Sequence, residues 1–127
     1  MENGIVITAD NEISVQEFSR DGHGVLNTDL RRIIGDSLEK VNPMHLIPPF
    51  CFMCNEDGLR LELPVNEAAS LLYGTYQHGS PIVGNIVILK VGNFNGEPDI
   101  VGLSEDEAEC LYDVLKSTFT FLKEAAA

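Results

Sequence analysis

The chain lacks several features that would assign it to the common functional classes of small proteins. Its apolar runs, such as Ile86–Leu89, end after a few residues, whereas a helix that crosses a bilayer needs about 20. The first residues, Met1–Gly4, include no basic region, and no small-residue cleavage site follows them. We therefore expect no secretory signal, no membrane contact and a cytoplasmic location.

Cysteine is scarce, with Cys51, Cys54 and Cys110 as its three occurrences. An odd number without a secretory signal argues against a disulfide framework and favours a reducing compartment. The Cys51 and Cys54 spacing, with His45 and Cys110 as further ligands, could form a zinc site, or the pair could act in redox chemistry. However, residues three apart on a strand point to opposite faces of a sheet. We predict that these cysteines are core residues and that no metal or cofactor is bound.

Catalytic motifs are also absent. The sequence contains no Gly-x-Ser-x-Gly elbow, no phosphate-binding loop and no His-Glu-x-x-His motif. The three histidines, His23, His45 and His78, lie far apart in the sequence. Because nothing assembles a nucleophile, a base and a shielded pocket, we predict that the protein is not an enzyme.

Basic residues are few: eight Lys and Arg stand against 20 Asp and Glu, which gives a net charge of −12. Such a surface repels nucleic acids and anionic membranes. Recognition by charge would therefore select a basic protein, and nucleic-acid-binding proteins are the commonest of these. The alternative is that the acidity serves only solubility.

The densest acidic run follows Ser104, which forms a capping-box pattern with Glu107. Carboxylates in the first turn stabilise a helix by about 0.3–1 kcal/mol each. The run lacks the turn glycine of a calcium loop, so we favour a structural role. Glu105, Asp106 and Glu109 remain candidates for partner contact.

What the sequence does contain is the periodicity of a small α+β domain. With 127 residues, 44% of them hydrophobic, the chain is long enough for one core. The patterns predict helices over 29–34, 67–73 and 105–122, and strands over 4–8, 13–16, 38–41, 50–54, 59–63 and 81–91.

We predict a single α+β domain over residues 1–124, and we interpret residues 125–127 as an expression scar. It would contain a mixed or antiparallel sheet of five or six strands, with an amphipathic C-terminal helix on one face. Because a small sheet leaves edge strands unpaired, a homodimer formed by edge pairing is possible.

Short motifs in the middle of the chain suggest a family. Cys54–Leu59 is an Asn-Glu-acidic-Gly turn, Leu63–Asn66 contains a Pro-x-Asn step, and Ile82–Gly84 begins a hydrophobic strand. In these motifs, and in Leu103 and Ser104 before the acidic run, the chain resembles the domain-of-unknown-function family 3846 over roughly residues 4–118. The resemblance implies an α+β fold and a phage, plasmid or other mobile-element context, hence a bacterial host. It implies no catalytic residue.

The uncharged stretch over residues 73–80 combines aromatic and hydrogen-bonding side chains. This mixture is typical of protein-binding surfaces, because Tyr supplies contact area at low entropic cost. The alternative is an ordinary connection between a helix and a strand. The candidate binding residues here are Tyr73, Tyr76, Gln77 and His78.

These observations favour a mobile-element accessory protein that binds and inhibits a host protein, with a nucleic-acid-handling defence enzyme as the leading candidate. An acidic protein can occupy a basic nucleic-acid channel. The alternative is a protein that sequesters a small ligand or nucleotide in a pocket around Tyr73 and Tyr76. The scarcity of Lys and Arg counts against a phosphate-bearing ligand.

Overall fold

A computed structural model of the chain describes residues 2–22, 26–75 and 79–126. The elements, in chain order, are β1 (Glu2–Ile7), β2 (Ile13–Phe18), α1 (Asn27–Ile34), β3 (Leu38–Val41), β4 (Phe50–Asn55), α2 (Glu67–Tyr73), β5 (Ile86–Phe94), β6 (Glu97–Val101) and α4 (Glu105–Ala126).

The strands form one antiparallel sheet of six with β5 at its centre. The strand order is β2-β1-β5-β4-β3, and β6 pairs with the second half of β5. Ile88 of β5 is aligned with Ile5 of β1 on one side and with Phe52 of β4 on the other. Farther along β5, Val91 lies opposite Ile100 of β6. The path ends at β2 and β3, and β6 pairs with β5 alone among the described strands.

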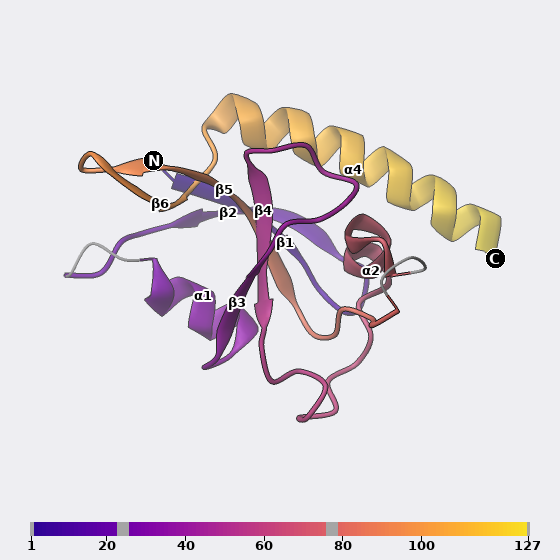
Figure 1. Cartoon of the computed structure of the whole chain (residues 1–127). Coiled ribbons are helices and arrows are strands. Elements are labelled where there is room, and N and C mark those ends of the chain that lie inside the picture. Colours follow the sequence, from indigo (N-terminus) through magenta and orange to yellow (C-terminus); the bar gives the residue numbers. More distant parts are fainter. Residues whose placement is uncertain (1, 23–25, 76–78, 127) are drawn as a thin grey trace.

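Helices cover both faces of the sheet (Figure 1). Over one face, Phe52 packs in a core with Leu72 of α2 and Leu115 of α4. Over the other face, Val87 packs in a core with Leu30 of α1. Because neighbouring residues on a strand point to opposite faces, the central strands supply both cores and read as nearly continuous apolar runs.

The predicted α+β class, the single sheet and the C-terminal helix on one face are confirmed. The Asn66 side chain caps α2 by accepting a hydrogen bond from the Ala69 N–H at 3.0 Å, and Gly74 ends this helix with φ +89°. At the start of α4, the Glu107 N–H donates to the Ser104 hydroxyl at 3.1 Å, and the Ser104 N–H donates to the Glu107 carboxylate at 2.9 Å.

The predicted strand over residues 59–63 is wrong. Both sides of β4 are already occupied by β3 and β5, so no edge remains for a hairpin partner. The segment instead forms turns, in which the Leu61 N–H donates to the Asp57 carbonyl and the Leu63 N–H to the Gly58 carbonyl. The alternating leucines consequently face solvent: Leu59 is 61% exposed and Leu61 is 50% exposed.

A smaller expectation also differs: the strand predicted over 81–91 begins only at Ile86 and extends to Phe94 as β5. At the start of α1, Leu26 occupies the cap position, without a side-chain hydrogen bond. The Asp29 carboxylate accepts from the Ser19 N–H at 2.8 Å, which ties the helix to the end of β2. Within the described ranges, no helix combines the length and the apolar character needed to cross a bilayer.

Candidate functional site

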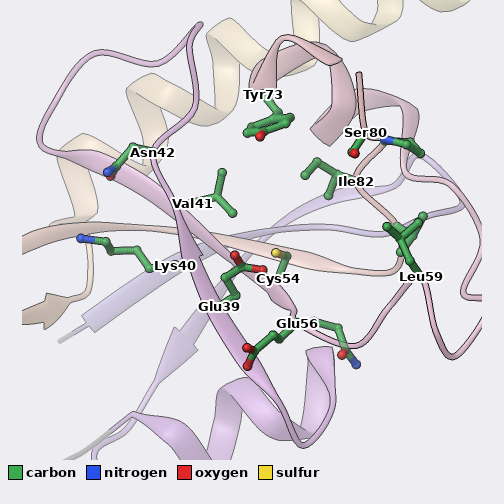
Figure 2. A pocket seen from close by; sticks show the side chains of 13 residues that line it. Glu39, Lys40, Val41, Asn42, Cys54, Glu56, Leu59, Tyr73, Ser80 and Ile82 are labelled. Carbon is green, nitrogen blue, oxygen red and sulfur yellow. The ribbon is translucent and has the colours of Figure 1, made fainter. Parts of the chain in front are cut away.

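A cleft opens beside the outer strand β3, next to the end of α2 (Figure 2). Its volume is about 400 Å³, within the range of roughly 300–1,000 Å³ that is typical of ligand sites. We call it the edge cleft. It is lined by Glu39, Lys40, Val41, Asn42, Cys54, Asn55, Glu56, Leu59, Tyr73, Ser80, Pro81, Ile82 and Val83.

One part of the edge cleft is apolar. Figure 2 shows Val41 of β3, Tyr73 of α2 and Ile82 facing the same space, with Cys54 of β4 beside them. Leu59, which is 61% exposed, adds an apolar group at the margin. An incoming side chain or ligand could therefore bury an apolar stem here.

The turn after β4 is fixed by a buried asparagine. The Asn55 amide group donates to the Ile34 carbonyl at 3.1 Å, and its oxygen accepts from the Asp57 N–H at 2.8 Å. At Gly58 the chain passes so close to Val83 that a Cβ would lie 2.5 Å from a Val83 methyl group. Only glycine allows this approach, which brings two walls of the cleft together.

A second asparagine fixes the wall formed by the segment before β5. Asn66 is fully buried, and its amide group donates to the Ile7 carbonyl at 3.0 Å and the Gly84 carbonyl at 2.9 Å. Gly84 has φ +79°, a conformation that favours glycine. These bonds join α2 to β1 and place Ile82 and Val83 against the cleft.

Two of the polar residues that line the edge cleft are acidic. Glu39 and Glu56 are both exposed, and neither forms a salt bridge with another residue of the described ranges. Burial, reinforced by the charge of Glu39, raises the pKa of the Cys54 thiol to about 12. This thiol is neutral at physiological pH, so it is neither a good nucleophile nor a ready metal ligand.

The lysine in the lining does not neutralise these carboxylates. Lys40 is aligned with Met53, which packs in the core under α1, and Figure 2 shows its side chain extending away from the cleft. On the face of the sheet that packs under α1, burial raises the pKa of the Cys51 thiol, and the charge of Lys40 partly offsets this effect. Lys40 therefore forms no salt bridge with either glutamate of the edge cleft.

The arrangement of the cysteines does not form a shared site. Cys51 and Cys54 are buried, as predicted, whereas Cys110 is exposed. Cys51 is aligned with Leu89 in the layer facing α1, and Cys54 packs in the core under α2 and α4. Among the residues that the structure describes, no three His, Cys, Asp or Glu side chains gather in a way that could hold a metal ion.

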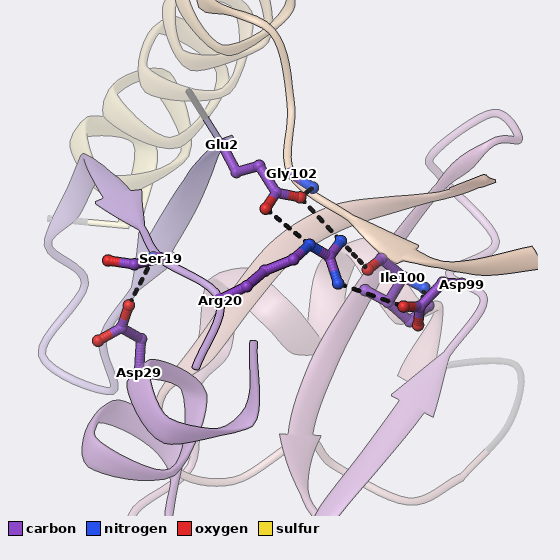
Figure 3. Close-up of polar contacts among 7 residues, drawn as sticks. All are labelled: Glu2, Ser19, Arg20, Asp29, Asp99, Ile100 and Gly102. Carbon is purple, nitrogen blue, oxygen red and sulfur yellow. Dashed lines mark hydrogen bonds and ion pairs between the residues drawn. The ribbon is translucent and has the colours of Figure 1, made fainter. Parts of the chain in front are cut away.

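Another acidic group lies at the opposite end of the sheet, where Arg20 neutralises it (Figure 3). The guanidinium makes two hydrogen bonds of 2.9 Å to Glu2 and one of 3.2 Å to Asp99. It also donates to the Ile100 carbonyl at 3.2 Å and lies 3.8 Å from the Phe94 ring centroid. We call these contacts the Arg20 network.

One predicted binding residue, Tyr73, lines the edge cleft. Tyr76, Gln77 and His78 lie outside the described residues. The predicted stretch and the edge cleft therefore share Tyr73 and Ser80.

The other predicted binding residues lie away from the cleft lining. Glu105, Asp106 and Glu109 are exposed in the first turns of α4. Their neighbour Glu107 caps the helix and also bonds Lys90 of β5 at 2.6 Å. The hydrogen bond from Lys90 is the largest cause that lowers the pKa of Glu107. This carboxylate therefore has a structural role.

Sequence reasoning missed Glu39 and Glu56 as a pair. They are separated by 17 positions in the chain, and the pairing of β3 with β4 brings both into the lining of one cleft. The available signal was the predicted strand over 38–41, whose alternation separates Glu39 from Lys40. The pairing partner of that strand could not be read from the pattern.

Comparison with known proteins identifies one family. The model described as "Domain of unknown function (DUF3846)" matches residues 1–116. No curated protein and no solved structure matches the chain. The three central motifs on which the resemblance rested meet at or next to the edge cleft: Cys54–Leu59 and Ile82–Gly84 contribute to its lining, and Asn66 fixes one wall.

Proposed function

The chain belongs to the domain-of-unknown-function family 3846, and on that premise we propose that it is a non-enzymatic accessory protein that binds a basic host protein through the edge cleft. In the phage and mobile-element context that the resemblance implies, this binding would inhibit the host protein. A nucleic-acid-handling defence enzyme has the required chemistry, because its substrate channel is basic.

The observation that carries this proposal is the pair of unneutralised carboxylates beside the apolar side chains of the cleft. Glu39 and Glu56 have no salt-bridge partner among the described residues, while Val41, Ile82 and Tyr73 present apolar surface next to them. Lysine and arginine combine a cationic head with an apolar stem, so they match both parts of the cleft. The neutral Cys54 thiol supports binding rather than covalent chemistry.

A small ligand is the second candidate, favoured by the cleft volume of about 400 Å³. The two carboxylates select against nucleotides and other phosphate esters, whose recognition normally uses cations or clustered N–H groups. A ligand bound here would be neutral or cationic. A thermal-shift screen of polyamines and nucleotides separates this function from protein binding, because a ligand that binds the folded state raises the melting temperature.

The test of protein binding compares two variants of equal net charge. Glu39→Lys with Glu56→Lys changes the cleft, and Glu12→Lys with Glu17→Lys changes exposed positions near and on β2; each pair moves the charge from −12 to −8. Each immobilised protein is incubated with bacterial host lysate at low and high salt. We expect the wild type and the β2 control to retain the same basic protein at low salt, and the cleft variant to lose it. Equal retention by the two variants would contradict the proposal.

A further inference from the structure

The outer edge of β3 borders the edge cleft, and no strand in the described ranges pairs with it. The Glu56 N–H donates to the Ser37 carbonyl at 2.9 Å, which continues the register of Leu38 opposite Asn55. Hydrogen-bonded and non-hydrogen-bonded positions alternate along antiparallel strands. The N–H and C=O groups of Leu38 and Lys40 therefore point away from β4 and are available to another strand.

We propose that the basic partner binds as an extended segment added to the outer edge of β3, with a lysine or arginine opposite Glu39. This inference rests on the proposed function, because it specifies how the edge cleft would hold its partner. The main chain of the segment would bond to Leu38 and Lys40. Its cationic side chain would contact Glu39 and Glu56 and lay its apolar stem along the cleft.

The geometry of the sheet supports this placement. The residue opposite Glu39 would share its face of the sheet, at a non-hydrogen-bonded position where opposed Cα atoms are about 4.5 Å apart and the side chains approach closely. Glu39 is aligned with Cys54, and Glu56 lies in the turn directly after β4 and lines the same cleft. A long cationic side chain at this position would lie beside Glu39 at the margin of the cleft.

The same register specifies the neighbouring residues of the segment. A residue opposite Lys40 would lie on the other face, where an acidic side chain is the complement. Residues opposite Leu38 and Val41, both partly buried, would be apolar. Because the added strand would run antiparallel to β3, the segment would read apolar, acidic, basic, apolar from its N-terminal end.

Charge also argues against a second copy of this chain as the occupant. When two copies of β3 pair antiparallel about a two-fold axis, each residue keeps the same face of the sheet in both copies. Directly opposed residues must share a face, and adjacent residues do not, so the axis passes through a residue and not between two residues. The two registers nearest the middle of Leu38–Val41 place either Glu39 opposite Glu39 of the second copy or Lys40 opposite Lys40. Like charges directly opposite each other destabilise a strand pair.

The experiment uses three synthetic peptides and the full chain labelled with ¹⁵N. The matched peptide carries Val-Glu-Lys-Leu at its centre, flanked by uncharged residues, and the swapped peptide carries Val-Lys-Glu-Leu. The third peptide has the matched sequence with N-methyl groups at the two amides that would bond to β3. Titrations followed by NMR detect affinities in the millimolar range. Hydrogen exchange of the Leu38 and Lys40 amides reports strand pairing directly.

We expect the matched peptide to bind about tenfold more tightly than the swapped peptide, because two opposite-charge pairs replace two like-charge pairs. The matched peptide should slow exchange at Leu38 and Lys40, and the methylated peptide should do neither. Glu39→Gln with Glu56→Gln should reduce the preference for the matched peptide, because only the pair at Lys40 then still discriminates between the peptides. Glu12→Gln with Glu17→Gln, the control of equal charge, should leave that preference unchanged.

Three results would overturn strand addition. One is equal binding of the matched and methylated peptides; another is unchanged exchange at Leu38 and Lys40 when the matched peptide is bound. The third is no peptide binding at all. None of these results affects the proposed function if the Glu39→Lys with Glu56→Lys variant still fails to retain the basic protein that the β2 control retains from lysate. If the two variants retain that protein equally, the proposed function itself is contradicted.

Discussion

At the β2 end of the sheet, Arg20 neutralises Glu2 and Asp99, whereas at the β3 end Glu39 and Glu56 have no salt bridge within the described part of the chain. The Arg20 side chain is 9% exposed and makes bonds to groups on β1 and β6. The carboxylates of the edge cleft are exposed and do not link one strand to another.

The difference shows that the charge of −12 has more than one origin. Some carboxylates hold elements together, as in the Arg20 network and in the Glu107 bond to Lys90. Others, at the edge cleft, have no structural partner among the described residues. Net charge alone cannot separate these roles, so the relevant measurements compare single sites at the two ends.

The largest expected effect is at the Arg20 network. Arg20→Met keeps an apolar stem over Phe94 but leaves Glu2 and Asp99 beside each other without a counter-charge. Removing one partner of a buried ion pair costs about 3–5 kcal/mol. Because Glu2 and Asp99 are 27% and 42% exposed, we expect a loss of about 3 kcal/mol in the free energy of unfolding, at the low end of this range, measured by urea denaturation.

Arg60→Met is the matched control for this measurement. The Arg60 pair with Asp57 is 3.3 Å long, and the Arg60 side chain is 71% exposed. Exposed pairs contribute at most about 1 kcal/mol. If the two methionine variants lose the same stability, the Arg20 network contributes no more than an exposed ion pair. The contrast between the neutralised β2 end and the β3 end of the sheet is then wrong.

A smaller effect is expected at Glu107, and it depends on pH. The bond from Lys90 lowers the pKa of Glu107 in the folded state, so its stabilisation is present above the unfolded pKa and is lost as the pH falls through the folded pKa. Glu107→Gln retains a capping-box side chain but removes the charge. We expect a loss of at most about 1 kcal/mol at neutral pH.

The dependence of stability on pH in the same variant tests the role of the Glu107 charge. Unfolding is measured in urea at about pH 7 and about pH 3.5, on either side of the ordinary carboxylate range. The wild type should lose more stability between these pH values than the Gln variant, because only the wild type gives up the Lys90 pair. An equal loss in both proteins would show that this carboxylate does not stabilise the fold.

Much of the fold was predictable because local rules and packing agree. The strand over 38–41, the helix over 67–73 and the Ser104 capping box all appear as predicted. The predicted strand over 59–63 failed because strand pairing is not local: β4 had already used both edges. Alternating leucines predict a strand only where an edge is free to accept one.

The candidate site was predictable only in part, for a related reason. Tyr73 was found through local composition, because aromatic and polar residues cluster after α2. The edge cleft itself arises from contacts between distant segments, such as Gly58 against Val83 and Asn66 with Gly84. The significance of Glu39 and Glu56 lies in missing partners, and partners are visible only in three dimensions.

The smallest expected change in stability, and the sharpest test of the comparison, comes from Glu39→Gln with Glu56→Gln. Neither carboxylate forms a salt bridge in the described ranges, so neutralising them removes repulsion on a chain of net charge −12. We expect a free energy of unfolding within about 0.5 kcal/mol of the wild type, with any change in the stabilising direction. A loss of unfolding free energy comparable to that of Arg20→Met would mean that these glutamates stabilise the fold. It would contradict the inference that they are available to bind a partner. Retained stability together with lost capture of the basic protein would assign them to binding, because a folded protein that no longer binds has lost only its recognition surface.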